Sequence, residues 1–145
     1  MALFKYLVIP LFLTVIFIGS ESLAKKAAIV IDFDTKEILF EVNANTKNYP
    51  ASLTKIMTLY ILFDYLDKDK LTNQSKLRVS SVAASRSPSK LYLEEGSWIK
   101  VEDAIMALII KSANDVATVV AENISGTEKE FAKLMTRYAR NLGME

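Results

Sequence analysis

Residues 49–58 read YPASLTKIMT and form the junction between a polar loop and a long apolar segment. Pro50 ends the loop, and the apolar segment from Ile56 onward predicts a helix. Ser52 and Lys55 are three residues apart, so a helix that begins here places the hydroxyl and the amine on one face. The free N–H groups and the dipole at a helix N-terminus also stabilise a developing anion. The stretch is a candidate nucleophile and base; the alternative is a helix-capping serine beside a solvated lysine.

The absence of histidine and cysteine restricts the chemistry that this serine can use. The 145 residues of the chain include no His and no Cys. A Ser-His-Asp triad, a cysteine nucleophile, a thiolate metal site and an H-E-x-x-H zinc site are therefore excluded within this chain. Lysine can replace histidine as a base where burial or a nearby positive charge lowers its pKa. The composition thus favours the reactive interpretation of Lys55.

The overall composition is that of a globular protein of about one domain. The chain is 51% hydrophobic and 24% charged, with a formal net charge of +1. This charge gives no electrostatic case for a nucleic-acid partner. The scattered carboxylates show no metal-ligand spacing, so neither a metal nor another cofactor is expected.

The N-terminus has the features of a secretory signal. Residues 1–24 combine a positive start at Lys5, an apolar run over residues 6–19 and small residues before a cleavage point after Ala24. The apolar run is shorter than the roughly 20 residues of a spanning helix. We therefore predict a cleaved signal and an exported protein, with an uncleaved membrane anchor as the alternative.

The first part of the exported chain predicts a β-hairpin. Residues 27–31 and 37–42 are short β-branched or apolar runs, and residues 32–36 contain turn formers. Two further extended pieces, 91–93 and 98–100, flank a tight turn. We expect the first pair of segments to form a hairpin of antiparallel strands. Residues 77–79 are a further extended piece, and we expect no other strand-rich segment that would complete a sheet.

Four helices are expected after the hairpin. The first, over residues 53–65, is apolar nearly all round, which predicts burial on all sides. Two more are expected over residues 101–110 and 116–124. The last opens at Thr127 with a capping-box pattern and ends near Gly143.

A second polar motif, Ser112-Ala113-Asn114, lies between two of the expected helices. By itself it is typical of a turn between helices, with a capping serine or asparagine. A reactive serine without histidine needs a lysine base, a second hydroxyl to relay the proton, and an amide to hold the substrate. Ser52, Lys55, Ser112 and Asn114 match these four roles in order.

The two motifs resemble those of the serine D-alanyl-D-alanine carboxypeptidases, the low-molecular-mass penicillin-binding proteins. That family and the class A β-lactamases share S-x-x-K, S-D-N and K-T-G motifs. Y-P-A-S-L-T-K-I-M-T and K-S-A-N-D-V-A look like the first two family blocks. The hairpin, the L-Y-L-E-E-G turn and the closing A-R-N-L-G-M also lie where similar family segments fall. The resemblance covers nearly all of residues 27–144.

The resemblance implies an enzyme of the periplasm or cell surface that removes the terminal D-Ala from peptidoglycan stem peptides ending in D-Ala-D-Ala. Ser52 would be the acyl-enzyme nucleophile and Lys55 its base. Ser112 would relay a proton, and Asn114 would orient the substrate. β-Lactams would acylate the same serine. The implied fold is α+β: an N-terminal β-hairpin plus the mostly helical lobe of the β-lactamase/D,D-peptidase-like (transpeptidase-like) fold.

Two departures from the family pattern qualify this expectation. The K-T-G motif is absent from the chain, and in the family it lies on a sheet strand well beyond position 145. Residues 25–145 therefore predict the N-terminal portion of a catalytic domain that lacks sheet strands and is weak or inactive without a complementing chain. Ala113 replaces the Asp of S-D-N, which favours a carboxypeptidase over a class A β-lactamase. A β-lactamase and a non-catalytic remnant that binds wall or a partner chain are the alternatives.

Overall fold

The computed structural model describes residues 26–144, which divide into a hairpin unit and a helical unit. The hairpin unit extends to Asn48, and the helical unit begins at Tyr49. The secretory signal expected over residues 1–24 lies outside the described residues. In the described part of the chain, no helix combines the length and the apolar character needed to cross a membrane.

The hairpin unit has the two antiparallel strands that the sequence predicts. β1 (Ala28–Ile31) pairs with β2 (Ile38–Val42), and the register shifts by a bulge before the last residue of β1. The Asp32 carboxylate shapes the turn, because it accepts hydrogen bonds from the backbone N–H groups of Asp34 (3.0 Å) and Thr35 (2.7 Å). The turn chemistry and the β-branched runs together account for this element.

The apolar side chains of the hairpin remain exposed. Seven of them keep between 40% and 61% of their surface accessible: Ile29, Val30, Ile31, Ile38, Leu39, Phe40 and Val42. Two strands alone cannot bury both of their faces, and an isolated hairpin is marginally stable in water. Both faces of this hairpin therefore remain available for contact with further structure.

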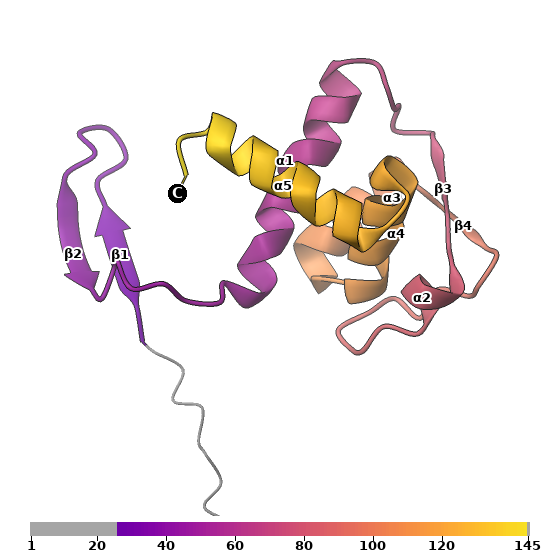
Figure 1. The fold of residues 1–145 in the computed structure, drawn as a ribbon, viewed down its shortest axis with the longest axis horizontal. Coiled ribbons are helices and arrows are strands. Elements are labelled where there is room, and N and C mark those ends of the chain that lie inside the picture. The colour runs from indigo at the N-terminus through magenta and orange to yellow at the C-terminus, as the bar shows by residue number, and fades with distance from the viewer. Residues whose placement is uncertain (1–25, 145) are drawn as a thin grey trace, which may run out of the picture. The chain divides into compact units, whose positions relative to one another are not determined.

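The helical unit is built around α1 (Thr54–Asp67), α4 (Asn114–Ser125) and α5 (Glu128–Asn141). Both α4 and α5 pack against α1, and Figure 1 shows α5 crossing it. The core forms along α1 and α4, where the following residues are 0% exposed: Ile61, Leu62, Val116, Val119 and Val120. This buried core packs the middle of α1 against α4.

The expectation that the first helix is buried on all sides is wrong for the described structure. Ile61 and Leu62 are buried, but Ile56, Tyr60 and Phe63 are 63%, 45% and 47% exposed. The reason is that the described chain covers α1 only where α4 and α5 pack on it. The uncovered part of α1 is thus an apolar surface.

A second two-stranded sheet includes the extended piece expected near residues 77–79. β4 (Trp98–Lys100) pairs antiparallel with β3 (Lys76–Arg78) rather than with residues 91–93. The backbone N–H groups of Leu91 and Leu93 instead donate to the buried carboxylate of Asp115. A side-chain acceptor has therefore replaced a strand partner for this segment.

The remaining helices follow the predictions with shifted ends. The short α2 (Ser81–Ala84) follows β3, and α3 (Val101–Met106) continues as a π-helical turn, η2 (Ala107–Lys111). The next helix, α4, begins at its asparagine rather than two residues later. The Thr127 hydroxyl caps α5 by accepting from the Glu130 N–H at 3.2 Å, which confirms the predicted start.

Candidate active site

Ser52 lies at the N-terminal end of α1, as the sequence predicts. It is the middle residue of a short 3-10 helix, η1 (Ala51–Leu53), that leads directly into α1. Ser52 is exposed to solvent. Ala51 has a φ of 48°, a left-handed conformation that residues other than glycine rarely adopt and that is often found at active sites. The hydroxyl is thus accessible and close to the positive end of the α1 dipole.

Lys55 contacts the second predicted motif directly. Its Nζ donates a hydrogen bond to Oδ1 of Asn114 at 2.8 Å, although the two residues are 59 positions apart in the chain. Partial burial lowers the pKa of the Lys55 ammonium below its ordinary value, because desolvation disfavours the charged form. A lowered pKa is what a lysine needs to accept a proton near neutral pH.

The Asn114 side chain is held in one orientation at the first turn of α4. Its Nδ2 donates to the carbonyl oxygen of Ser87 at 3.0 Å, and its backbone N–H donates to the carbonyl of Ser89 at 2.7 Å. Because the amide nitrogen is directed to a carbonyl, the amide oxygen is the atom that faces Lys55. The loop over residues 85–90 therefore determines which atom of Asn114 the lysine meets.

Ser112 occupies the bend between η2 and α4. Its φ of 54° and ψ of 41° place it in the left-handed region and end the preceding helix. Among the described residues, the hydroxyls of Ser52 and Ser112 form no side-chain hydrogen bond. Of the four predicted site residues, the structure brings Lys55 and Asn114 into contact. The two serines lie on the adjoining turns.

Asp115 is a site residue that the sequence interpretation missed. It is 0% exposed and accepts hydrogen bonds from the backbone N–H groups of Leu91 (3.0 Å), Leu93 (3.2 Å) and Val116 (2.9 Å). A carboxylate in the first helical turn is a weak signal, because many helices begin with an acid. Its role depends on a segment more than twenty residues upstream. Through these hydrogen bonds, Asp115 holds residues 91–93 close to Asn114, its neighbour in the chain.

A cavity of about 360 Å³ lies beside the Lys55–Asn114 contact, between α1, α4 and α5. Besides Lys55, the charged residues on its wall are Arg86 and Glu128. Ser52 and Ser112 are not among the residues that line it, whereas Ala51, the neighbour of Ser52, is. Within residues 26–144, no group of three or more acidic side chains is arranged to hold a metal ion.

A carboxylate in place of the Asn114 amide tests the electrostatics of this contact. In Asn114→Asp, a negative charge would face the Lys55 ammonium across about 2.8 Å. An opposite charge at this range favours the protonated amine, so the pKa of Lys55 should rise, by about 1–3 units. The pKa can be followed by NMR titration of the Lys55 Cε signal, with Asn141→Asp on the exposed end of α5 as the control. An unchanged or lowered pKa in Asn114→Asp would show that the contact does not form in solution.

A family model and two related proteins that match the sequence carry the same description. A family model described as D-alanyl-D-alanine carboxypeptidase matches residues 17–145. D-alanyl-D-alanine carboxypeptidase DacF of Bacillus subtilis is 40% identical over 120 residues, covering 83% of this chain and 31% of that protein. DacC of Escherichia coli is 34% identical over 133 residues, covering 88% and 33% respectively. The chain thus spans about a third of the length of these relatives.

Solved structures show the same likeness in three dimensions. The D-alanyl-D-alanine carboxypeptidase DacD from Francisella tularensis matches with a TM-score of 0.78 and 31% identity, over 99% of this chain and 33% of that one. Penicillin-binding protein D2 from Listeria monocytogenes, in its ampicillin-bound form, matches with a TM-score of 0.65 and 29% identity, over 84% and 48%. These matches confirm the predicted α+β fold, with only part of the domain represented in this chain.

Proposed function

Because the chain belongs to the D-alanyl-D-alanine carboxypeptidase family, we propose that it carries the serine half of an acyl-transfer site acting on peptidoglycan stem peptides. The substrate would end in D-Ala-D-Ala. The observation that carries this proposal is the 2.8 Å hydrogen bond between Lys55 and Asn114, at the end of α1 that presents Ser52. It unites the residues of both motifs at one place.

The proposed reaction uses four side chains. Lys55, with its pKa lowered by burial, removes the proton of Ser52, whose Oγ attacks the carbonyl carbon of the penultimate D-Ala. The C–N bond to the terminal D-Ala breaks, and Ser112 passes the proton to the leaving amine. Water then cleaves the ester and restores the serine hydroxyl. Asn114, held by the Ser87 carbonyl, orients both Lys55 and the substrate backbone.

The proposed partner is a segment that carries K-T-G. It would belong either to the same polypeptide or to a separate, complementing chain. Its proposed contact surface is an apolar groove of about 520 Å³ between α1 and α5, next to Ser52. The groove is lined mainly by apolar side chains, among them Leu53, Ile56, Met57, Met135 and Leu142. The apolar hairpin is a second uncovered surface. Burial of such surfaces is a main source of folding and association free energy.

The wider assignments follow from the same family membership. We propose that residues 1–24 direct export, that residues 25–145 are the N-terminal portion of the catalytic domain, and that the enzyme acts in the periplasm or at the cell surface. An enzyme held at the inner membrane would meet its peptidoglycan substrate at that membrane. β-Lactams would acylate Ser52. The solved ampicillin-bound relative from Listeria monocytogenes supports that ligand class.

The β-lactamase alternative requires a carboxylate that activates water for deacylation. Glu128 is the acid that shares a cavity wall with Lys55, but it accepts hydrogen bonds from Arg86 and from the Thr118 hydroxyl. Both carboxylate oxygens of Glu128 are therefore already engaged by donors of this chain, which leaves neither directed at a water beside Ser52. This argues for a long-lived acyl-enzyme rather than for rapid hydrolysis of the β-lactam.

Labelling with a fluorescent penicillin tests the proposal. The chain would be assayed alone and together with the K-T-G-bearing remainder of the catalytic domain of the Bacillus subtilis relative. We expect labelling to be at least about 100-fold faster in the complemented sample, since a missing group that stabilises the oxyanion commonly costs 10²–10³ in rate. The Ser52→Ala variant gives the background. Equal labelling with and without the segment would refute the need for it. Labelling of neither sample above background would count against the serine site.

A further inference from the structure

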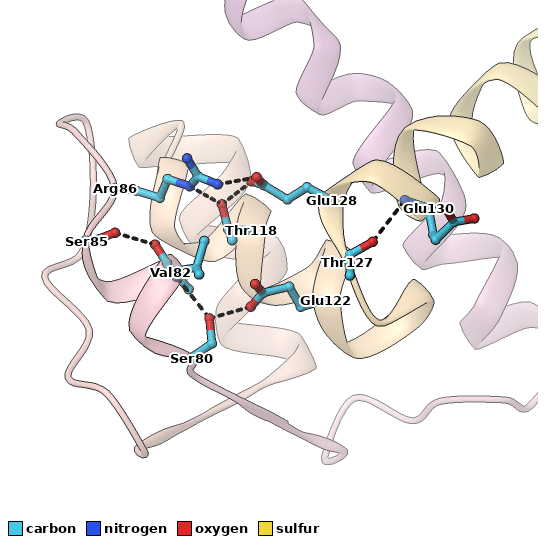
Figure 2. Close-up of polar contacts among 10 residues, drawn as sticks. Ser80, Val82, Ser85, Arg86, Thr118, Glu122, Thr127, Glu128 and Glu130 are labelled. Carbon is cyan, nitrogen blue, oxygen red and sulfur yellow. Dashed lines mark hydrogen bonds and ion pairs between the residues drawn. The ribbon is translucent and has the colours of Figure 1, made fainter.

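The loop that orients Asn114 is tied down by a second set of polar contacts, away from the predicted motifs. Figure 2 shows the side chain of Arg86 directed toward Thr118 of α4 and Glu128 of α5. Arg86 Nε donates to the Thr118 hydroxyl at 3.0 Å, and the guanidinium also pairs with the Glu128 carboxylate. The Thr118 hydroxyl donates to the other oxygen of Glu128 at 2.6 Å. These three residues, named here the 86–118–128 clasp, form a closed ring of hydrogen bonds.

The clasp is built to hold its members in one arrangement. Thr118 is 2% exposed and lies on the buried core helix α4, so its hydroxyl is a fixed point. Glu128 is the first residue of α5, where the helix dipole favours a carboxylate. Charge-assisted hydrogen bonds to a planar guanidinium are directional and stronger than neutral ones. The ring therefore restrains the backbone of the loop at Arg86.

The restraint passes directly to the candidate site. Ser87, the neighbour of Arg86 in the chain, supplies the carbonyl that accepts from Asn114 Nδ2. A planar peptide joins the two residues, so holding Arg86 limits where the Ser87 carbonyl can point. With that carbonyl in place, Asn114 turns its Oδ1 to Lys55. Three non-covalent contacts and one peptide bond thus link Glu128 at the start of α5 to Lys55, the candidate base.

We propose that the 86–118–128 clasp is a positioning device for the Lys55–Asn114 contact. Arg86, Thr118 and Glu128 are then positioning residues, which act through Ser87 and Asn114 and do not touch the substrate. The effect on Asn114 stands on the contacts just described. The effect on acyl transfer rests on the proposed function.

The rival interpretation is that the clasp is a purely structural tie (a staple), which connects α5 to α4 and to the loop and contributes only to stability. Breaking such a structural tie would lower stability without changing the hydrogen bonding of the Asn114 side chain. Glu128→Gln and Glu130→Gln separate the two interpretations. Both residues are exposed acids in the first turn of α5, so both substitutions lose the same helix-end charge interaction. Only Glu128 belongs to the clasp, whereas Glu130 pairs with Lys133 on its own helix.

NMR on the full chain provides the readout. In Glu128→Gln, hydrogen exchange of the Asn114 side-chain amide should accelerate about fivefold, the ratio expected for an ion pair near the upper end of the surface range. Arg86→Met should accelerate the same exchange, with Arg137→Met on the exposed face of α5 as its control. Glu130→Gln and Arg137→Met should leave the exchange of the Asn114 amide unchanged. The exchange rate is the deciding signal, because Arg86 and Glu128 share a cavity wall with Lys55 and their charges act on its pKa directly.

Two outcomes would overturn the proposal. One is a fall in melting temperature in Glu128→Gln with Asn114 exchange equal to that of Glu130→Gln; this would leave only a structural tie. The other is slower or unchanged exchange in Arg86→Met. Penicillin labelling of the complemented chain is measured separately. Absence of labelling would refute the proposed function, while the NMR signals would still decide the clasp.

Discussion

Replacing Lys55 with methionine is expected to slow acylation of Ser52 by about 10³-fold, in the middle of the range for loss of a general base. Methionine keeps the length and apolar stem of the side chain but cannot accept a proton. With no histidine anywhere in the chain, no imidazole can take over the role. The measurement is the second-order rate of labelling by a fluorescent penicillin, in the chain complemented with the K-T-G segment.

The matched control for Lys55→Met is Lys68→Met. Lys68 follows the other end of α1, where it pairs with Asp64 at 2.8 Å on the surface. Its loss removes an equal charge from the same helix without touching the candidate site, so labelling should stay within about twofold of the unmodified chain. A rate in Lys55→Met above about a tenth of the unmodified rate would exclude lysine as the base.

The largest expected effect on stability is that of Asp115→Ala. The substitution leaves three backbone N–H groups, those of Leu91, Leu93 and Val116, without their carboxylate acceptor. Buried donors without a partner cost about 1–3 kcal/mol each, less where water can enter the space. We therefore expect a loss of about 3 kcal/mol in the free energy of unfolding, measured by urea denaturation.

Two further variants sharpen the Asp115 prediction. Asp115→Asn keeps one oxygen acceptor and should lose less than Asp115→Ala. Asp103→Ala removes an exposed acid from the first turn of α3 and should change the free energy of unfolding by about 0.5 kcal/mol or less. Equal losses in Asp103→Ala and Asp115→Ala would show that the helix dipole, not the fastening of residues 91–93, explains the role of Asp115.

The positions of the residues at the centre of the candidate site were predictable from local patterns. Ser52 and Lys55 follow the polar junction before α1, and Asn114 follows the polar kink before α4, so each position could be read from the sequence. That the two motifs meet could be inferred only from the chemistry they would share. The 2.8 Å contact between Lys55 and Asn114 now provides the geometry.

The supporting contacts were not predictable, because they join segments whose separation carries no periodic signal. Asp115 binds backbone N–H groups, which every residue type except proline offers, so the sequence does not mark its partners. Arg86 and Glu128 are 42 residues apart and resemble ordinary surface charges. The same limit explains why α1 is not buried on all sides as expected. Its apolar residues face every side of the helix, but the described chain covers only part of that surface.

The most direct test of the central claim is mass spectrometry of the complemented chain after reaction with penicillin. We expect one added penicilloyl group, located on the peptide that contains Ser52 and absent in Ser52→Ala. An adduct on Ser112 or another residue, or an adduct undiminished in Ser52→Ala, would contradict the assignment of Ser52 as the nucleophile.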